Sequence, residues 1–166
     1  GVMHAREWIT AASVTYIISQ LTCNYDNEAS YIKNLDWYFV PVLNPDGYEY
    51  SHNVDRLWRK NRAKNKISNC VGVDLNRNWG YDWGKSGSSS DPCSDTYRGT
   101  KPFSEPETAT IANFFINNPN IQWVGYLSVH SYGQNIVYPW GAPNVIVEDH
   151  RELNDVGIQA AKVSEI

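Results

Sequence analysis

A histidine and a glutamate near the start of the chain have the spacing of metal ligands. His4 and Glu7 lie three positions apart in His4-Ala5-Arg6-Glu7, so a ring nitrogen and a carboxylate can be directed at one point. His130, far along the chain, is the second histidine that the fold would have to bring to them. Two histidines and one glutamate with one open position form a catalytic zinc arrangement. The pair alone is a weak signal, since it is usually a partly exposed helix start, and it gains weight from the residues that follow.

A carboxylate is also needed behind the metal-binding histidines. Zinc binds neutral histidine, and an acceptor on the far ring nitrogen fixes both the tautomer and the ring orientation. Asp74 is a candidate because it ends an apolar segment, just before Asn76 and Arg77. The other interpretation is a loop aspartate that stabilises a turn.

Two groups of cationic residues could act on a substrate. Arg56, Arg59 and Arg62 recur every three residues, a pattern that usually indicates a solvated basic face. A peptidase has a use for one of them, because an arginine can stabilise the oxyanion that forms when water attacks a carbonyl. Asn76-Arg77 places an amide beside a planar guanidinium, which suits a bidentate grip on a carboxylate.

Other residues near these motifs are less specific. Tyr132, two positions after His130, could close over a bound side chain or could lie in the core. His52 and His150 have no partner at ligand spacing, and we interpret both as surface histidines.

Helices and short apolar runs must position these residues. The apolar spacing predicts a helix over 7–22 and another from about 148 to 166. A third is predicted to begin at a capping box of Ser104 and Glu107 and to end at about 117. Apolar runs predict strands at 35–43, 70–75, 121–130 and 136–138, with a turn at 44–47, a surface segment over 51–69 and a long loop over 80–103. This alternation indicates an α/β layered domain.

Bulk properties limit the class of protein. The chain has 166 residues, 42% hydrophobic and 19% charged, which is enough for one globular domain. A net charge of −4 argues against a nucleic-acid partner, and no apolar run approaches the length of a membrane span. The N-terminus has neither an initiator Met nor the features of a signal peptide. We therefore expect a chain that begins inside a longer precursor or is a piece of one.

The three cysteines allow two interpretations. Cys70 and Cys93 bracket a loop rich in Gly and Ser, and a disulfide there would stabilise by on the order of 3 kcal/mol. The alternative is three reduced, buried thiols in a cytosolic enzyme. Cys23 is left over, as a buried free thiol or with a partner outside this chain.

Five motifs in one order make the chain resemble the zinc carboxypeptidases of the carboxypeptidase A/B family. They are His4-Ala5-Arg6-Glu7-Trp8, Asn44-Pro45-Asp46-Gly47-Tyr48, Arg56-Leu57-Trp58-Arg59-Lys60, Asp74-Leu75-Asn76-Arg77-Asn78-Trp79 and His130-Ser131-Tyr132. The resemblance covers essentially all 166 residues and is closest to the secreted digestive type. It implies a mixed central sheet flanked by helices, truncated at both ends, in residues 1–166 as a partial catalytic domain.

The resemblance also implies the role of each site residue. His4, Glu7 and His130 would bind one zinc ion, and Asp74 would orient His4. Arg59 would polarise the scissile carbonyl and stabilise the oxyanion, and Asn76 with Arg77 would hold the terminal carboxylate of a peptide. Further implied features are upstream subsites lined by Arg6, Ser131 and Tyr132, a disulfide between Cys70 and Cys93, and non-proline cis peptides at Ser131–Tyr132 and Pro139–Trp140.

Function follows from the resemblance as an expectation. The protein would be a monomeric, secreted, extracellular exopeptidase that hydrolyses the C-terminal peptide bond and is made as a zymogen with an N-terminal pro-segment. In this family the general base Glu, the mobile Tyr and the pocket-floor residue would fall beyond Ile166, and Glu148 and Glu152 are poor substitutes. The segment alone would therefore be inactive, and the preference for apolar or basic C-terminal residues stays open. The alternative is a non-catalytic zinc- or peptide-binding relative that lacks the base.

Overall fold

The computed structural model describes residues 1–141 and 145–163 in two units, Gly1–His130 and Ser131–Ile166. The first unit contains α1 (Trp8–Cys23), η1 (Tyr25–Asn27), α2 (Ser30–Lys33), α3 (Pro45–Asn53), η2 (Leu75–Arg77) and α4 (Pro106–Asn117). The second contains α5 (His150–Val163). No helix in the described part of the chain is long and apolar enough to cross a membrane.

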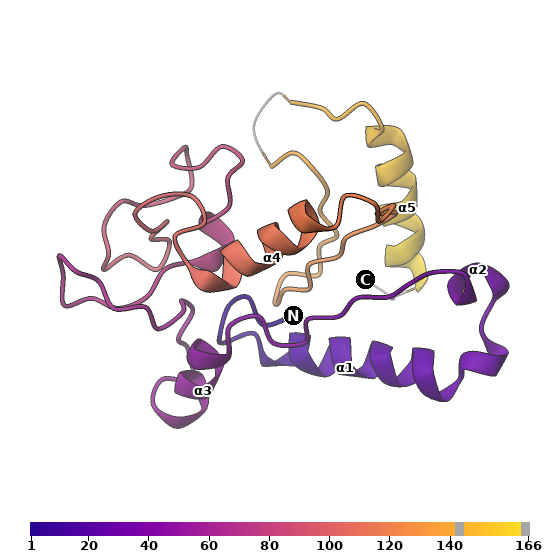
Figure 1. The fold of residues 1–166 in the computed structure, drawn as a ribbon, viewed down its shortest axis with the longest axis horizontal. Coiled ribbons are helices and arrows are strands. Elements are labelled where there is room, and N and C mark those ends of the chain that lie inside the picture. Colours follow the sequence, from indigo (N-terminus) through magenta and orange to yellow (C-terminus); the bar gives the residue numbers. More distant parts are fainter. Residues whose placement is uncertain (142–144, 164–166) are drawn as a thin grey trace. The chain divides into compact units, whose positions relative to one another are not determined.

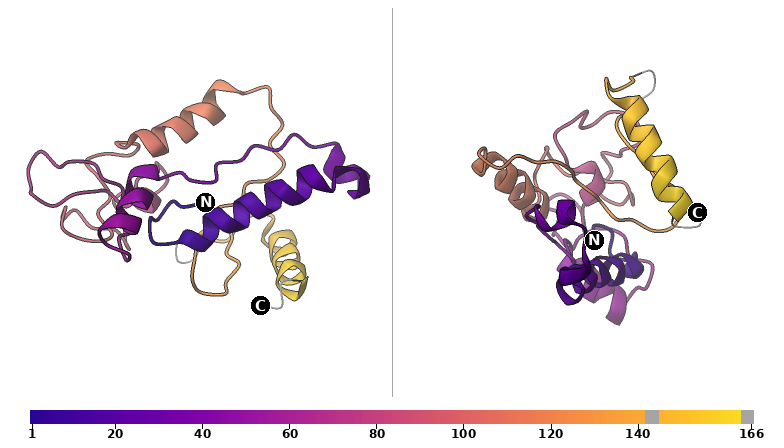
Figure 2. Two further views of the ribbon diagram at one scale, coloured as in Figure 1. Left: turned by 90° about the horizontal axis from the view of Figure 1, so that it is seen from below. Right: turned by 90° about the vertical axis from the view of Figure 1, so that its right-hand side faces the viewer.

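The first helix forms as its apolar spacing predicts. α1 begins at Trp8 and ends at Cys23, within one residue of the predicted bounds. Thr10 fixes its start, because the Thr10 hydroxyl accepts from the Val2 amide at 2.8 Å and donates to the Glu7 carbonyl at 2.7 Å. Figures 1 and 2 show α1 and α4 on opposite sides of the extended segment that leads to α3. Cys23 is a free thiol but exposed, so its predicted burial is wrong.

Residues 44–47 begin a helix, so the predicted turn there is wrong. The Asn44 side chain accepts from the Gly47 amide at 3.0 Å, and Pro45 occupies the first helical position of α3. Proline suits that position because its missing N–H would have no helical partner. The surface segment predicted over 51–69 is also partly wrong, since Ser51, Lys60 and Asn61 are buried.

The start of α4 is held by Asn78 and not by the predicted capping box. Glu105 is the N-cap residue and makes no side-chain cap, while the Ser104 hydroxyl donates to the Glu105 carboxylate at 2.7 Å. The Asn78 amide oxygen accepts from the Glu105 backbone amide at 3.2 Å and the Thr108 hydroxyl at 2.7 Å. The helix ends at Asn117 as predicted.

The predicted strands are not formed among residues 1–141 and 145–163, and the mixed sheet is therefore not confirmed. Segments 35–43, 70–75, 121–130 and 136–138 form no β-ladder; the only bridges in the described part are isolated, at Lys64–Val71 and Ser89–Tyr97. A strand requires a neighbour for its backbone groups. Most residues of 121–130 also stay open to solvent, with Leu127 86% exposed, whereas Val73 and Leu75 in the segment 70–75 are buried.

The remaining predictions about the backbone hold. Cys70 and Cys93 form a disulfide across the long loop. The Ser131–Tyr132 and Pro139–Trp140 peptides are both cis. The last predicted helix forms as α5, with residues 164–166 lying outside the described part.

Candidate metal centre

One turn of chain brings His4 and Glu7 together. The Glu7 amide donates to the His4 carbonyl at 3.1 Å, and Glu7 is the N-cap residue of α1. This turn places the two side chains on one side of the backbone, where His4 Nδ1 lies 2.7 Å from Glu7 Oε1. Both residues are buried, so their geometry is set by packing around them.

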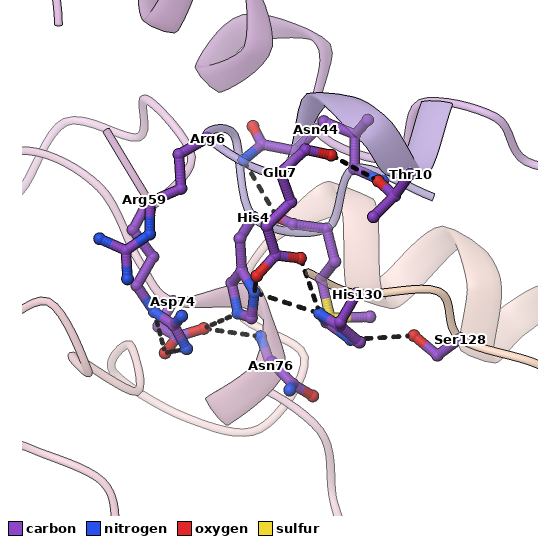
Figure 3. Close-up of polar contacts among 12 residues, drawn as sticks. His4, Arg6, Glu7, Thr10, Asn44, Arg59, Asp74, Asn76, Ser128 and His130 are labelled. Atoms are coloured by element: carbon purple, nitrogen blue, oxygen red, sulfur yellow. Dashed lines mark hydrogen bonds and ion pairs between the residues drawn. The ribbon is translucent and has the colours of Figure 1, made fainter. Parts of the chain in front are cut away.

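His130 completes the group from the far end of the first unit. Its Nδ1 lies 2.9 Å from Glu7 Oε2 and 3.2 Å from His4 Nδ1. Figure 3 shows the three side chains pointing at one another, and their potential ligand atoms all lie within 4.8 Å. Tetrahedral zinc, with donors at about 2.0–2.1 Å, places those donors about 3.3 Å apart. The three residues therefore fit a zinc ion with little movement.

Asp74 holds the ring of His4 from the opposite side. It is fully buried, and its Oδ1 lies 3.1 Å from His4 Nε2. With Nε2 as the donor to Asp74, the lone pair of His4 lies on Nδ1, the atom that faces Glu7 and His130. Oδ1 also accepts from the Asn76 amide at 2.9 Å. The loop aspartate thus stabilises a turn, in η2, and orients a ligand as well.

Arg59 balances the charge of Asp74. Its Nε and Nη2 both donate to one oxygen, Asp74 Oδ2, at 3.1 and 2.9 Å, which are charge-assisted hydrogen bonds. Arg56 and Arg62 point elsewhere: their guanidinium carbons lie 3.7 Å from the Trp8 ring and 3.6 Å from the Tyr50 ring. The arginine repeat is therefore not one solvated face, because each member has a separate partner.

Burial and hydrogen bonding oppose each other at the ionisable groups. Burial would raise the pKa of Glu7, but the hydrogen bonds from His130 and His4 outweigh it and hold the pKa at about 2. Burial would lower the pKa of His4, but its bonds to Asp74 and Glu7 raise it above the usual value. The pKa of Asp74 is lowered despite burial, through His4 and Arg59. The hydrogen bonds of the centre thus favour the ionised forms of Glu7 and Asp74.

The predicted carboxylate-binding residues, Asn76 and Arg77, lie on the 3-10 helix η2, whose N-cap residue is Asp74. Arg77 Nε donates to the Gly87 carbonyl at 2.7 Å and Nη1 donates to the Asn76 carbonyl at 2.9 Å. Arg77 pairs with no carboxylate within the described ranges. An apolar cavity of about 370 Å³ opens beside Asn76, lined by Met3, Asn76, Trp79, Ile111, Phe115, Tyr126 and Ser128.

Other predicted residues are less closely tied to the centre. Arg6 Nη1 donates to the Leu57 carbonyl at 3.4 Å and lies 3.7 Å from Asp95. Ser131 and Tyr132 belong to the second unit, and their roles as subsite residues stay predictions. His52 is exposed but stacks on Trp8, with ring centroids 3.8 Å apart.

Two contacts at the centre have no sequence signal of their own. Ser128 Oγ lies 3.1 Å from His130 Nε2, and Asn44 donates to the Met3 carbonyl, next to His4. A serine or an asparagine that makes such a contact has no characteristic spacing, although Asn44 is recognisable as a helix cap from the proline after it.

Comparison with known proteins identifies the family. The family described as zinc carboxypeptidase matches residues 1–165. The chain belongs to the zinc carboxypeptidase family. A zinc carboxypeptidase of Simulium vittatum is 44% identical over 96% of this chain and 53% of its own length. The crystal structure of the carboxypeptidase A from Helicoverpa armigera superimposes with a TM-score of 0.89 at 41% identity, covering 96% of this chain and 39% of that one.

Some members of the family are named as inactive. An inactive metallocarboxypeptidase of Talaromyces stipitatus is 45% identical over 84% of this chain and 25% of its own length. The chain thus spans about a quarter to a half of the length of these relatives. Family membership alone therefore does not decide between a catalytic and a non-catalytic protein.

Proposed function

We propose that the chain carries the zinc-binding part of a peptidase that removes the C-terminal residue of peptides and proteins. The observation that carries this proposal is the convergence of His4, Glu7 and His130, with Asp74 behind His4 and Arg59 behind Asp74. Bound zinc, one ion per chain, would act as a Lewis acid that activates water. The arrangement supports hydrolysis because it leaves a coordination position open.

The chain's own residues would bind and orient the substrate. We propose that Arg77, with the amide of Asn76, binds the terminal carboxylate, because its guanidinium is held by carbonyl groups and pairs with no acid in the described part. Arg59 would stabilise the oxyanion next to the metal. Arg6, Ser131 and Tyr132 would contact the residues upstream of the cleaved bond.

The localisation, the oligomeric state and the precursor form are proposed from the resemblance to the secreted zinc carboxypeptidases. We propose a secreted, extracellular and monomeric enzyme that is made with an N-terminal pro-segment. The Cys70–Cys93 disulfide supports an oxidising compartment.

A non-catalytic zinc- or peptide-binding protein is the second candidate. A relative at 45% identity that is named inactive favours it, because its match covers 84% of this chain. Such a protein would bind zinc and would not hydrolyse peptides. An activity assay therefore separates the two candidates.

The experiment compares the hydrolysis of peptides with free and with amidated C-termini by the unmodified protein and by its variants. We expect Arg77→Ala to raise KM and to remove the preference for a free carboxylate. Arg59→Ala should mainly lower kcat, by about a hundredfold or more, as for loss of an oxyanion donor. Arg62→Ala is the matched control, because Arg62 stacks on Tyr50 and Trp58.

Two results would contradict the proposal. One is that the unmodified protein and Arg77→Ala hydrolyse peptides with free and with amidated C-termini equally well. This result would show that Asn76 and Arg77 do not bind the terminal carboxylate. Zinc binding without hydrolysis of any peptide would favour the non-catalytic candidate.

A further inference from the structure

A single buried amide joins the two segments that carry the metal ligand and the arginine. Asn44 is fully buried, and its Nδ2 donates to the Met3 carbonyl at 3.2 Å and the Lys60 carbonyl at 3.1 Å. Its Oδ1 accepts from the Gly47 amide at 3.0 Å. The side chain therefore uses both of its N–H groups and its oxygen.

The two carbonyls belong to residues next to the functional groups. Met3 precedes His4, and Lys60 follows Arg59. A backbone bond between the same segments, from the Ala5 amide to the Arg59 carbonyl at 3.0 Å, lies beside them. Asn44 thus joins the segments at the backbone, and Asp74 joins them at the side chains, as Figure 3 shows.

We propose that Asn44 is a positioning residue that sets the separation of His4 and Arg59. The proposal rests on the proposed function only where it names His4 a zinc ligand. Asp74 can bind the side chains of His4 and Arg59 at once only if the two backbone segments that carry them stay at a fixed separation. Asn44 supplies that constraint from the side opposite Asp74, because one rigid amide group reaches both carbonyls.

Asn44→Asp separates this role from helix capping. An aspartate has the same shape and is an equally good N-cap, so the bond from the Gly47 amide is kept. Ionised, it has no donor for the two carbonyls, and protonated it has one at most. The carboxylate and the carbonyl oxygens would repel each other and move the two segments apart.

Gly47 provides a second variant that leaves Asn44 unchanged. A Cβ on Gly47 would lie 2.6 Å from the Asn44 amide atoms and from the Lys60 carbonyl. Gly47→Ala should therefore push apart the Asn44 side chain and the Lys60 carbonyl, the two groups that the hydrogen bond joins. Alanine favours helix over glycine by about 1 kcal/mol, so loss of function in this variant would not follow from helix propensity.

Asn78→Asp is the matched control. Asn78 is also fully buried, and its Nδ2 donates to the Arg98 and Lys101 carbonyls at 2.9 and 3.1 Å. Its side-chain contacts lie in the loop before α4 and at the start of that helix, and they involve neither His4 nor Arg59. Asn78→Asp should lower Tm about as much as Asn44→Asp does, without changing the geometry of His4 and Arg59.

The experiment has two readouts on the purified chain. One is zinc affinity, by competition with a chromophoric chelator. The other is the NMR signal of the Arg59 Nε–H in the metal-free chain, assigned with Arg59→Lys, and its protection from solvent exchange. We expect Asn44→Asp and Gly47→Ala to lose zinc affinity and Nε–H protection at least tenfold, and Asn78→Asp to change each less than twofold.

The outcomes separate this inference from the proposed function. An unchanged affinity and an unchanged Arg59 signal in a folded Asn44→Asp or Gly47→Ala chain would overturn the inference, as would equal losses in Asn78→Asp. If the unmodified chain bound no zinc, the proposed function would fail. The metal-free Arg59 signal would still decide the role of Asn44.

Discussion

At the scale of single residues, the charge balance of the centre depends on Glu7. Its carboxylate faces His4 Nδ1 and His130 Nδ1 and is almost inaccessible to water. Burial alone would favour the neutral acid, yet the histidines hold its pKa at about 2. Folding is therefore linked to the ionisation of this one group.

This linkage predicts acid sensitivity of the metal-free chain. Because the folded pKa of Glu7 lies below its ordinary value of 4.5, its contribution to stability is present above that pH and is lost as pH falls through about 2. The loss attributable to Glu7 should be up to about 3 kcal/mol. Denaturant unfolding at a series of pH values measures it.

Glu7→Gln provides the comparison for this prediction. Glutamine does not titrate, so the difference in free energy of unfolding between the two proteins should shrink as pH falls below 4.5. A difference that stays constant from neutral pH to pH 2 would show that the histidines do not stabilise the Glu7 anion.

Sequence spacing could predict only the local part of the site. His4 and Glu7 share one turn, so their spacing already brings them together. His130 comes from far along the chain and was assigned through family resemblance. The Asn44 contacts could not be predicted, because the Met3 and Lys60 carbonyls that it binds lie on separate segments.

At the scale of elements, helices were more predictable than strands. α1 and α4 follow from local periodicity, whereas a strand depends on partners elsewhere. Segments 35–43 and 121–130 have the composition of buried strands but form no ladder in the described part. Aromatic packing still joins them, since Tyr38 and Trp123 ring centroids lie 5.4 Å apart.

The disulfide-bonded loop is an element whose contribution can be measured. Cys70 and Cys93 close a loop with 23 residues of sequence separation. Replacing both by Ser should lower the free energy of unfolding by about 3 kcal/mol, because the unfolded chain regains its freedom. Cys23→Ser is the control, since Cys23 is free and exposed. Equal stability of the double variant and the control would contradict a stabilising role for the bond.

At the scale of the whole molecule, the chain carries one compact polar centre and matches part of the length of its relatives. It spans 53% of the length of its Simulium vittatum relative. The proposed metal ligands all lie within the first unit, so we expect zinc binding to need no group outside that unit. Turnover is a separate property. We expect residues 1–166 alone to bind zinc without hydrolysing peptides.

Zinc titration of the purified chain tests the central claim most directly. We predict one zinc per chain, with His4→Ala, Glu7→Gln and His130→Ala each lowering affinity at least a hundredfold. Asp74→Asn should lower it about 10–100-fold, because it removes the partner that orients His4. His150→Ala, on α5 of the second unit, should leave affinity unchanged. No tightly bound zinc, or an affinity that none of the three ligand substitutions lowers, would contradict the account.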